Sequence, residues 1–164
     1  MFAGDFWTSD WLWSLPLILA TVLFHVIGFG AFNTRLPKLL GLAATFRRDI
    51  ARFTLVAGAA TLVVTVLHGL EALVWAFAYR GLDALPTMRR AMLYSLNAMT
   101  TYGHADDVLP ERWRLMGALE ALNGVILVGL TTAFLYGVIA DLWSEERRRR
   151  SRSAELPVVG RPSD

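Results

Sequence analysis

The sequence has 164 residues, of which 55% are hydrophobic and 18% charged, with a mean hydropathy of +0.44. That proportion of apolar residues exceeds what one soluble core of this size can bury, so the composition predicts an integral membrane protein. The absence of cysteine excludes disulfides, thiolate metal sites and dithiol redox chemistry. A net charge of only +2, with clustered basic residues, indicates membrane topology and argues against nucleic-acid binding.

Three apolar segments reach the roughly 20 residues that a helix needs to cross a bilayer. They cover residues 11–31, 53–79 and 113–143. An acidic stretch with Asp5 and Asp10 precedes the first segment, which lacks both the basic start and the small-residue cleavage pattern of a signal peptide. The first segment is therefore predicted to be a retained helix.

Basic residues flank the second and third segments on one side of the membrane. Residues 32–52 carry five basic side chains against one acid, and Arg147–Arg150 and Arg152 follow the third segment. The positive-inside rule predicts that both flanks are cytoplasmic and that the N-terminus and the connection over residues 80–112 lie outside. Residues 1–52 thus comprise the first helix and an amphipathic cytoplasmic linker.

The basic residues 144–164 are predicted to form a disordered cytoplasmic tail. Arginines of this kind can bind anionic lipid headgroups, at about 1 kcal/mol each. The alternative is that Arg147–Arg152 only retain the topology.

Residues 88–101, MRRAMLYSLNAMTT, form a shorter apolar segment without Gly or Pro. At about 14 residues it is too short to cross a bilayer and long enough for a half-helix that enters the membrane and stops. Lipid offers no hydrogen bonds, so polar groups must satisfy the end of such a helix. The residues that follow, TTYGHADD over residues 100–107, supply hydroxyl, carbonyl and carboxylate oxygens.

This arrangement favours a cation. The C-terminal end of a helix carries about half a negative charge. A return strand of small residues can turn its carbonyl oxygens toward an axis and replace the hydration shell of an ion. Because one chain cannot surround an ion in this way, we expect a cyclic assembly, most simply a homotetramer.

The order of helix, half-helix, TTYGHAD and helix resembles the pore domain of the potassium channel family, whose filter reads TVGYG followed by Asp. The resemblance covers residues 53–143, and WRLMGALEALNG (residues 113–124) is similar to the inner-helix opening of small bacterial members with one extra N-terminal helix. It implies an all-α membrane protein with three transmembrane helices and a re-entrant pore helix and filter loop. It also implies a homotetramer in a bacterial inner membrane that conducts potassium.

The resemblance further implies a role for each residue of the loop. The cation-coordinating filter falls on Thr101, Tyr102, Gly103, His104 and Ala105. A monovalent cation is expected at the first three of these, Thr101, Tyr102 and Gly103. The residues expected to support the filter from behind are Tyr94, Asn97, Thr100 and Asp106.

Several of these residues also have simpler interpretations. Tyr94 and Asn97 share one helix face, and they can equally be an interfacial aromatic residue and a cap for a local carbonyl. Gly124 falls where the family often has an inner-helix hinge, but small residues in membrane helices also serve packing alone. The residues expected to line the inner pore are Val128, Thr132 and Tyr136, which recur at helical spacing.

The filter departs from the family at three positions. Tyr102 stands where Val or Ile is usual, His104 where Tyr or Phe is usual, and Ala105 replaces the second glycine. An L-alanine in the positive-φ conformation of a filter glycine costs about 1–2 kcal/mol per subunit. A potassium channel, a non-selective cation channel and a non-conducting regulatory membrane subunit therefore all remain open.

The acids Glu71 and Glu120 fall within the predicted membrane helices, with His68 three residues before Glu71. Intramembrane ionisable groups are often functional, yet structural pairing with arginines is the preferred interpretation here. The expected partners are Arg80, Arg89 and Arg114.

The pair His25 and His68 raises the alternative of a bis-histidine haem. At 1.5 Å per residue, His25 lies about 6 Å to the cytoplasmic side of its helix centre and His68 about 3 Å to the outer side, which argues against a shared ligand. The sequence lacks the catalytic motifs HExxH, GxSxG and GxxxxGK. Neither an enzyme nor a cofactor protein is therefore predicted.

Overall fold

A computed structural model describes residues 4–43, 49–103 and 108–155. This part of the chain is helical, without strands, and its elements in order are α1 (Gly4–Ala43), α2 (Asp49–Gly81), α3 (Met88–Met99), the short 3-10 helix η1 (Glu111–Trp113) and α4 (Arg114–Glu155). Three segments are long and apolar enough to cross a membrane: Thr8–Leu36, Phe53–Gly81 and Glu111–Ser144. The predicted all-helical class with three such helices is confirmed at this level.

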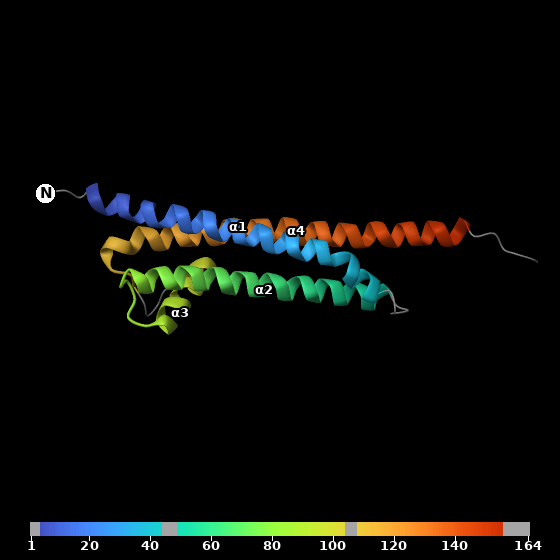
Figure 1. Ribbon diagram of the computed structural model, residues 1–164, viewed down its shortest axis with the longest axis horizontal. Helices are drawn as coiled ribbons and strands as arrows, with labels where there is room; N and C mark the ends of the chain where they lie inside the picture. Colours follow the sequence, from blue (N-terminus) through green and yellow to red (C-terminus); the bar gives the residue numbers. More distant parts are fainter. Residues whose placement is uncertain (1–3, 44–48, 104–107, 156–164) are drawn as a thin grey trace, which may run out of the picture.

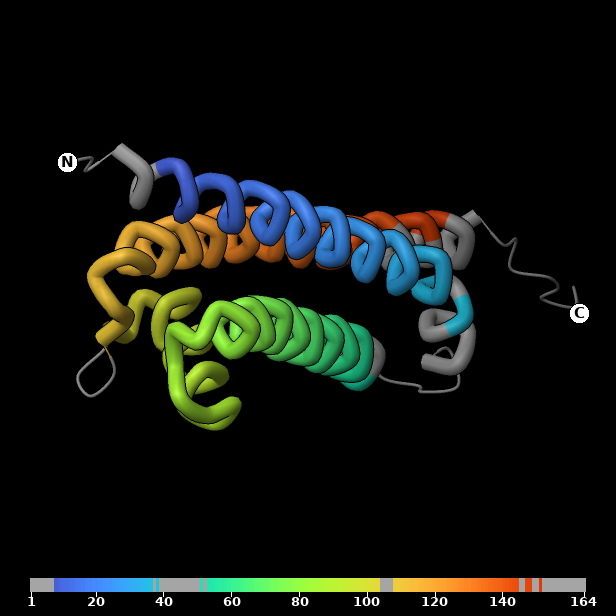
Figure 2. The backbone as a smooth tube through the Cα atoms, turned by 60° about the vertical axis from the view of Figure 1, so that its left-hand side comes forward, coloured from blue at the N-terminus to red at the C-terminus, as the bar shows by residue number. Residues whose placement is uncertain are grey.

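The three long helices lie side by side (Figures 1 and 2). Helices α1 and α4 run in the same direction and α2 runs against them, so the start of α1, the end of α2 and the start of α4 share one end of the bundle. Helix α3 packs beside α2 and α4 at this end. Helix α4 extends beyond the other helices at the opposite end.

Helices α1 and α4 are longer than their apolar segments predict. Helix α1 continues past residue 31 because Phe32 and Leu36 still pack into a buried cluster with Val56 of α2 and Val138 of α4. The linker predicted over residues 32–52 is therefore helical as far as Ala43 and again from Asp49. Residues 144–155 of the predicted tail belong to α4, and residues 156–164 lie outside the described part of the chain.

A hydrogen bond joins the N-terminal part of α1 to the start of α4. Asp10 is buried, and its carboxylate accepts a hydrogen bond from the Met116 backbone N–H at 3.1 Å. The first backbone N–H groups of a helix have no partner within the helix, so a side-chain acceptor there stabilises its start. In this chain a neighbouring helix supplies the acceptor.

Helix α3 has clear start signals. Thr87 is extended (φ −138°, ψ 152°), and its hydroxyl accepts a hydrogen bond from the Arg90 N–H. Arg80 donates to the Leu85 carbonyl at 2.6 Å and so fastens the connection from α2. Both contacts fix the point at which α3 begins.

The last turn of α3 lies beside the first third of α4. Met99 is buried in a cluster with Ala72 of α2 and Leu127 of α4. A Cβ on Gly124 would lie 2.6 Å from the Met99 Cα, so only glycine permits this approach. Gly124 is about 15 Å along α4 from Arg114. The end of α3 is therefore level with the interior of the third candidate span.

The close approach at Gly124 predicts that Gly124→Ala destabilises the protein. The new methyl group would overlap the Met99 backbone, at a cost of about 1–3 kcal/mol. Gly129→Ala on the same helix is the control, because no atom lies within 4 Å of its added Cβ and only the helix propensity of alanine acts there. The change in the free energy of unfolding, measured in detergent by circular dichroism, should have opposite signs in the two variants. Equal stability of the two would contradict a close contact at Gly124.

Candidate functional site

The predicted filter begins where α3 ends. The Thr101 N–H donates to the Ala98 carbonyl at 3.1 Å, and the Tyr102 N–H donates to the Asn97 carbonyl at 3.0 Å. This pair of bonds is the pattern of a Schellman C-cap. Of the predicted filter and its supports, His104, Ala105 and Asp106 lie outside the described residues.

Thr101 adopts the left-handed backbone region, with φ 56°. The extended return segment predicted to start at Thr101 therefore does not include it. A β-branched residue rarely adopts this region, which costs an L-residue about 1–2 kcal/mol. Gly103 also has positive φ, at 94°, which glycine tolerates without cost.

Residues 100–103 and one face of α4 are exposed in the single chain. Thr100, Thr101 and Gly103 are exposed, and Tyr102 is 85% exposed. The predicted inner-pore residues are likewise exposed: Val128, Thr132 and Tyr136. These side chains are available for contacts outside the chain, and their pore role stays a prediction.

The two predicted filter supports on α3 differ in their surroundings. Tyr94 is buried, with its ring edge-on to Tyr79 at 5.3 Å between centroids and its hydroxyl against Gly117. Asn97 is half-buried, and its backbone carbonyl accepts from Tyr102. Tyr94 thus packs α3 against α2 and α4, and Asn97 contributes its backbone to the end of α3.

Glu120 is fully buried and joins three helices. It accepts hydrogen bonds from the Tyr79 hydroxyl of α2, at 2.7 Å, and from the Ser95 hydroxyl of α3. The predicted pairing with an arginine is wrong for this acid. The hydroxyl groups of Tyr79 and Ser95 lie beside Glu120, whereas the Arg80 guanidinium donates to the Leu85 carbonyl near the end of α2.

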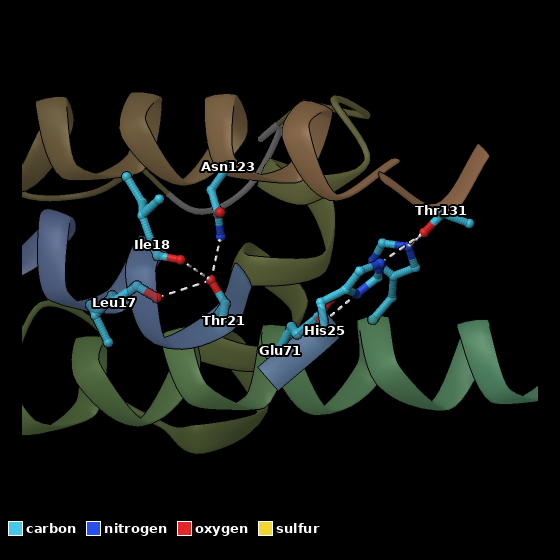
Figure 3. Close-up of polar contacts among 8 residues, drawn as sticks. Leu17, Ile18, Thr21, His25, Glu71, Asn123 and Thr131 are labelled. Carbon is cyan, nitrogen blue, oxygen red and sulfur yellow. Dashed lines mark hydrogen bonds and ion pairs between the residues drawn. The ribbon is translucent and has the colours of Figure 1, made fainter. Parts of the chain in front are cut away.

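Glu71 is also fully buried, and its neighbours are histidines instead of the predicted arginines. Its Oε1 lies 2.6 Å from His25 Nδ1, and its Oε2 lies 3.2 Å from His68 Nδ1. Thr131 Oγ1 of α4 lies 3.1 Å from Nε2 of each histidine. We call these four residues the histidine cluster, and Figure 3 labels three of them, His25, Glu71 and Thr131.

The depth difference predicted for His25 and His68 is wrong. Their ring centroids lie 5.2 Å apart. The sequence estimate assumed that helix midpoints align, whereas contacts between side chains set the stagger of α1 against α2. The two rings therefore lie next to each other.

A second polar contact links α1 to α4 next to this cluster. The Asn123 side-chain amide donates to Thr21 Oγ1 at 2.9 Å, and the Thr21 hydroxyl reaches the Leu17 and Ile18 carbonyls (Figure 3). Thr21 and His25 lie four residues apart on α1, as one helix face requires. This spacing was the available sequence signal for Thr21, whereas the other contact residues that sequence reasoning missed, Tyr79, Ser95 and Thr131, lie on other helices.

The buried environment of Glu120 predicts that Tyr79→Phe destabilises the protein. Removing one donor to a buried acid costs about 1–3 kcal/mol. Tyr136→Phe removes the same hydroxyl from a side chain that is 75% exposed, and should change the free energy of unfolding little. Thermal unfolding in detergent compares the two, and a similar effect of both variants would contradict the role of Glu120 as a packing centre.

Comparison with known proteins gives no family assignment. No protein-family model, no curated protein and no solved structure matches this chain. The resemblance to potassium channel pores therefore rests on the residues of the loop and of its flanking helices.

Proposed function

We propose that the chain is one subunit of a homotetrameric cation channel in a bacterial inner membrane, most simply potassium-conducting. In this proposal α3 is the pore helix of a re-entrant loop. The segment from Thr101 to Ala105 is the filter, and cations bind at Thr101, Tyr102 and Gly103. The observation that carries the proposal is the end of α3, which packs against Gly124 and Leu127 deep along α4.

The depth of this helix end supports a cation site. Helix α3 ends at Met99, and the N–H groups of Thr101 and Tyr102 cap its last turn. The negative end of its dipole points toward the loop, which favours a positive charge there. In a membrane such a helix end needs protein, water or an ion beside it. The Thr101 and Tyr102 N–H groups meet the second requirement in part, and a cation among loop oxygens would meet the first.

The strained backbone of Thr101 also supports the proposal. Left-handed conformations of β-branched residues are held only where surrounding structure imposes them, and they gather at functional sites. Here α3 is held by Met99 against α4 and by Ser95 against Glu120. The rigid helix can therefore present the Thr101 backbone and hydroxyl in a fixed orientation.

The exposed face of α4 supports an assembly of copies. The residues Val128, Thr132 and Tyr136 recur at four-residue spacing on this face. They lie further along α4 than Gly124, beside which α3 ends. Around a four-fold axis the same face from each copy would line the inner pore. The proposal places the N-terminus outside and Arg147–Arg152 at cytoplasmic anionic lipid. No enzymatic activity, cofactor or nucleic-acid partner forms part of it.

Reconstituted protein should carry potassium across liposome membranes. With a potassium gradient and a fluorescent flux dye, we expect flux for potassium and little for sodium. Equal flux for both ions would indicate a non-selective cation pore. No flux for either, with the tetramer intact in cross-linking, would contradict conduction and favour the regulatory subunit.

A variant that restores the family filter, His104→Tyr with Ala105→Gly, controls for this last outcome. If the native protein is silent and the double variant conducts, the fold is a pore whose filter has lost conduction. If neither conducts, the proposed pore itself is wrong.

Thr101→Gly should separate stability from conduction. Glycine tolerates positive φ, so the free energy of unfolding of the variant should equal that of the native protein or exceed it by up to about 1 kcal/mol. It should also lose most cation flux, because the threonine hydroxyl is absent from the innermost coordination ring. Thr100→Gly is the control, since Thr100 has φ −91° and gains nothing from glycine. Unchanged flux in Thr101→Gly would remove Thr101 from the ion path.

A further inference from the structure

We propose that the histidine cluster is a binding site for a divalent transition metal ion of the Zn²⁺ type. Its ligands are His25 Nδ1, His68 Nδ1 and the Glu71 carboxylate, and it joins α1 to α2 inside the helix bundle. This site is separate from the loop between α3 and α4. It does not depend on the proposed channel function.

The donor atoms are already close together. The ligand atoms of His25, His68 and Glu71 lie within 4.8 Å of one another. Zn²⁺ holds imidazole nitrogen and carboxylate oxygen at about 2.0–2.2 Å, so neighbouring ligands on a tetrahedron lie about 3.3 Å apart. The nitrogen–oxygen separations in the cluster are 2.6 and 3.2 Å. Small side-chain shifts therefore suffice for coordination.

Glu71 keeps one oxygen without a hydrogen bond inside the cluster. With Glu71 ionised and both imidazoles neutral, each imidazole carries one ring hydrogen and Thr131 carries one hydroxyl hydrogen. These three hydrogens suffice for the three hydrogen bonds of the cluster. Glu71 Oε2 then keeps its lone pairs 3.2 Å from His68 Nδ1 in a buried site, where a bound cation would offset the negative charge.

The geometry at Glu71 favours a metal ion over an additional proton. Glu71 Oε2 is buried and lies 3.2 Å from His68 Nδ1, but the alignment leaves it without a well-formed hydrogen bond. A shared proton requires donor and acceptor in line, whereas a metal ion needs only both lone pairs directed at one point. Imidazole nitrogen with one carboxylate suits zinc and its neighbours better than magnesium or calcium.

Thr131 is placed to orient both ligands. If both Nε2–H groups donate to the Thr131 hydroxyl oxygen, both Nδ1 atoms keep free lone pairs on the side of Glu71. Metal-binding histidines usually donate their other ring N–H to such an outer partner. The Phe29 ring lies 4.2 Å from the His25 ring and stacks on Phe134, which shields the cluster from water. His68 is 25% exposed in the single chain.

Equilibrium dialysis of the full-length protein against Zn²⁺ tests the site directly. The protein is purified in detergent without a histidine tag, stripped with a chelator, and its bound zinc is measured by mass spectrometry. We expect one zinc per chain, and a loss of affinity of more than about tenfold in His25→Asn and His68→Asn. Asparagine keeps a hydrogen-bonding group near the Nδ1 position but is a poor zinc ligand. Thr65→Asn, an exposed position on the same helix as His68, is the control and should bind zinc as the native chain does.

A second variant keeps the test decisive if the asparagine variants misfold. The chain has no cysteine, so His68→Cys introduces a single thiol. With Co²⁺ it should produce a thiolate-to-cobalt charge-transfer band, and Val66→Cys, exposed on the same helix, should not. Zinc binding unchanged in folded His25→Asn and His68→Asn, no zinc bound by the native protein, or no cobalt band in His68→Cys would each overturn the metal site.

Discussion

Two fully buried carboxylates, Glu71 and Glu120, constrain how the helices of this protein pack. A buried carboxylate without partners costs several kcal/mol, so each must meet donors from facing helices at one rotation and one level. Glu120 meets Tyr79 and Ser95, which joins α2, α3 and α4. Glu71 meets His25 and His68, which joins α1 to α2. Apolar contacts alone would tolerate sliding or rotation between such uniformly apolar helices, and these polar contacts specify one arrangement.

The same constraint determines where the loop after α3 lies. Ser95 is attached to Glu120 in α4, and Met99 packs against Gly124 and Leu127 four residues and more further along that helix. Helix α3 therefore cannot move away from the bundle without exposing a buried acid. Its rigid attachment explains how Thr101 is held at positive φ. The proposed cation site thus depends on a carboxylate that does not itself belong to the loop.

Helix α1 has its own polar contacts to the rest of the chain. Asp10 accepts from the start of α4, Thr21 contacts Asn123, and His25 belongs to the histidine cluster. These contacts are spaced along one face of the helix, and they make α1 an integral part of the bundle. If the histidine cluster binds a metal ion as proposed, that ion would be the strongest of the links between α1 and α2.

The sequence by itself determined that the chain is all-helical with three long apolar helices, because length and composition set the solvent in which each segment is stable. It also indicated a short helix before TTYGHADD, since an apolar segment of this length cannot span a bilayer. The partners of Glu71 and Glu120 and the meeting of His25 with His68 were decided only by the tertiary structure. Helix stagger and rotation depend on side-chain packing between segments far apart in the chain. The hydropathy pattern specifies neither the stagger nor the rotation. The left-handed Thr101 has the same origin, because a residue adopts a strained backbone only when its surroundings impose it.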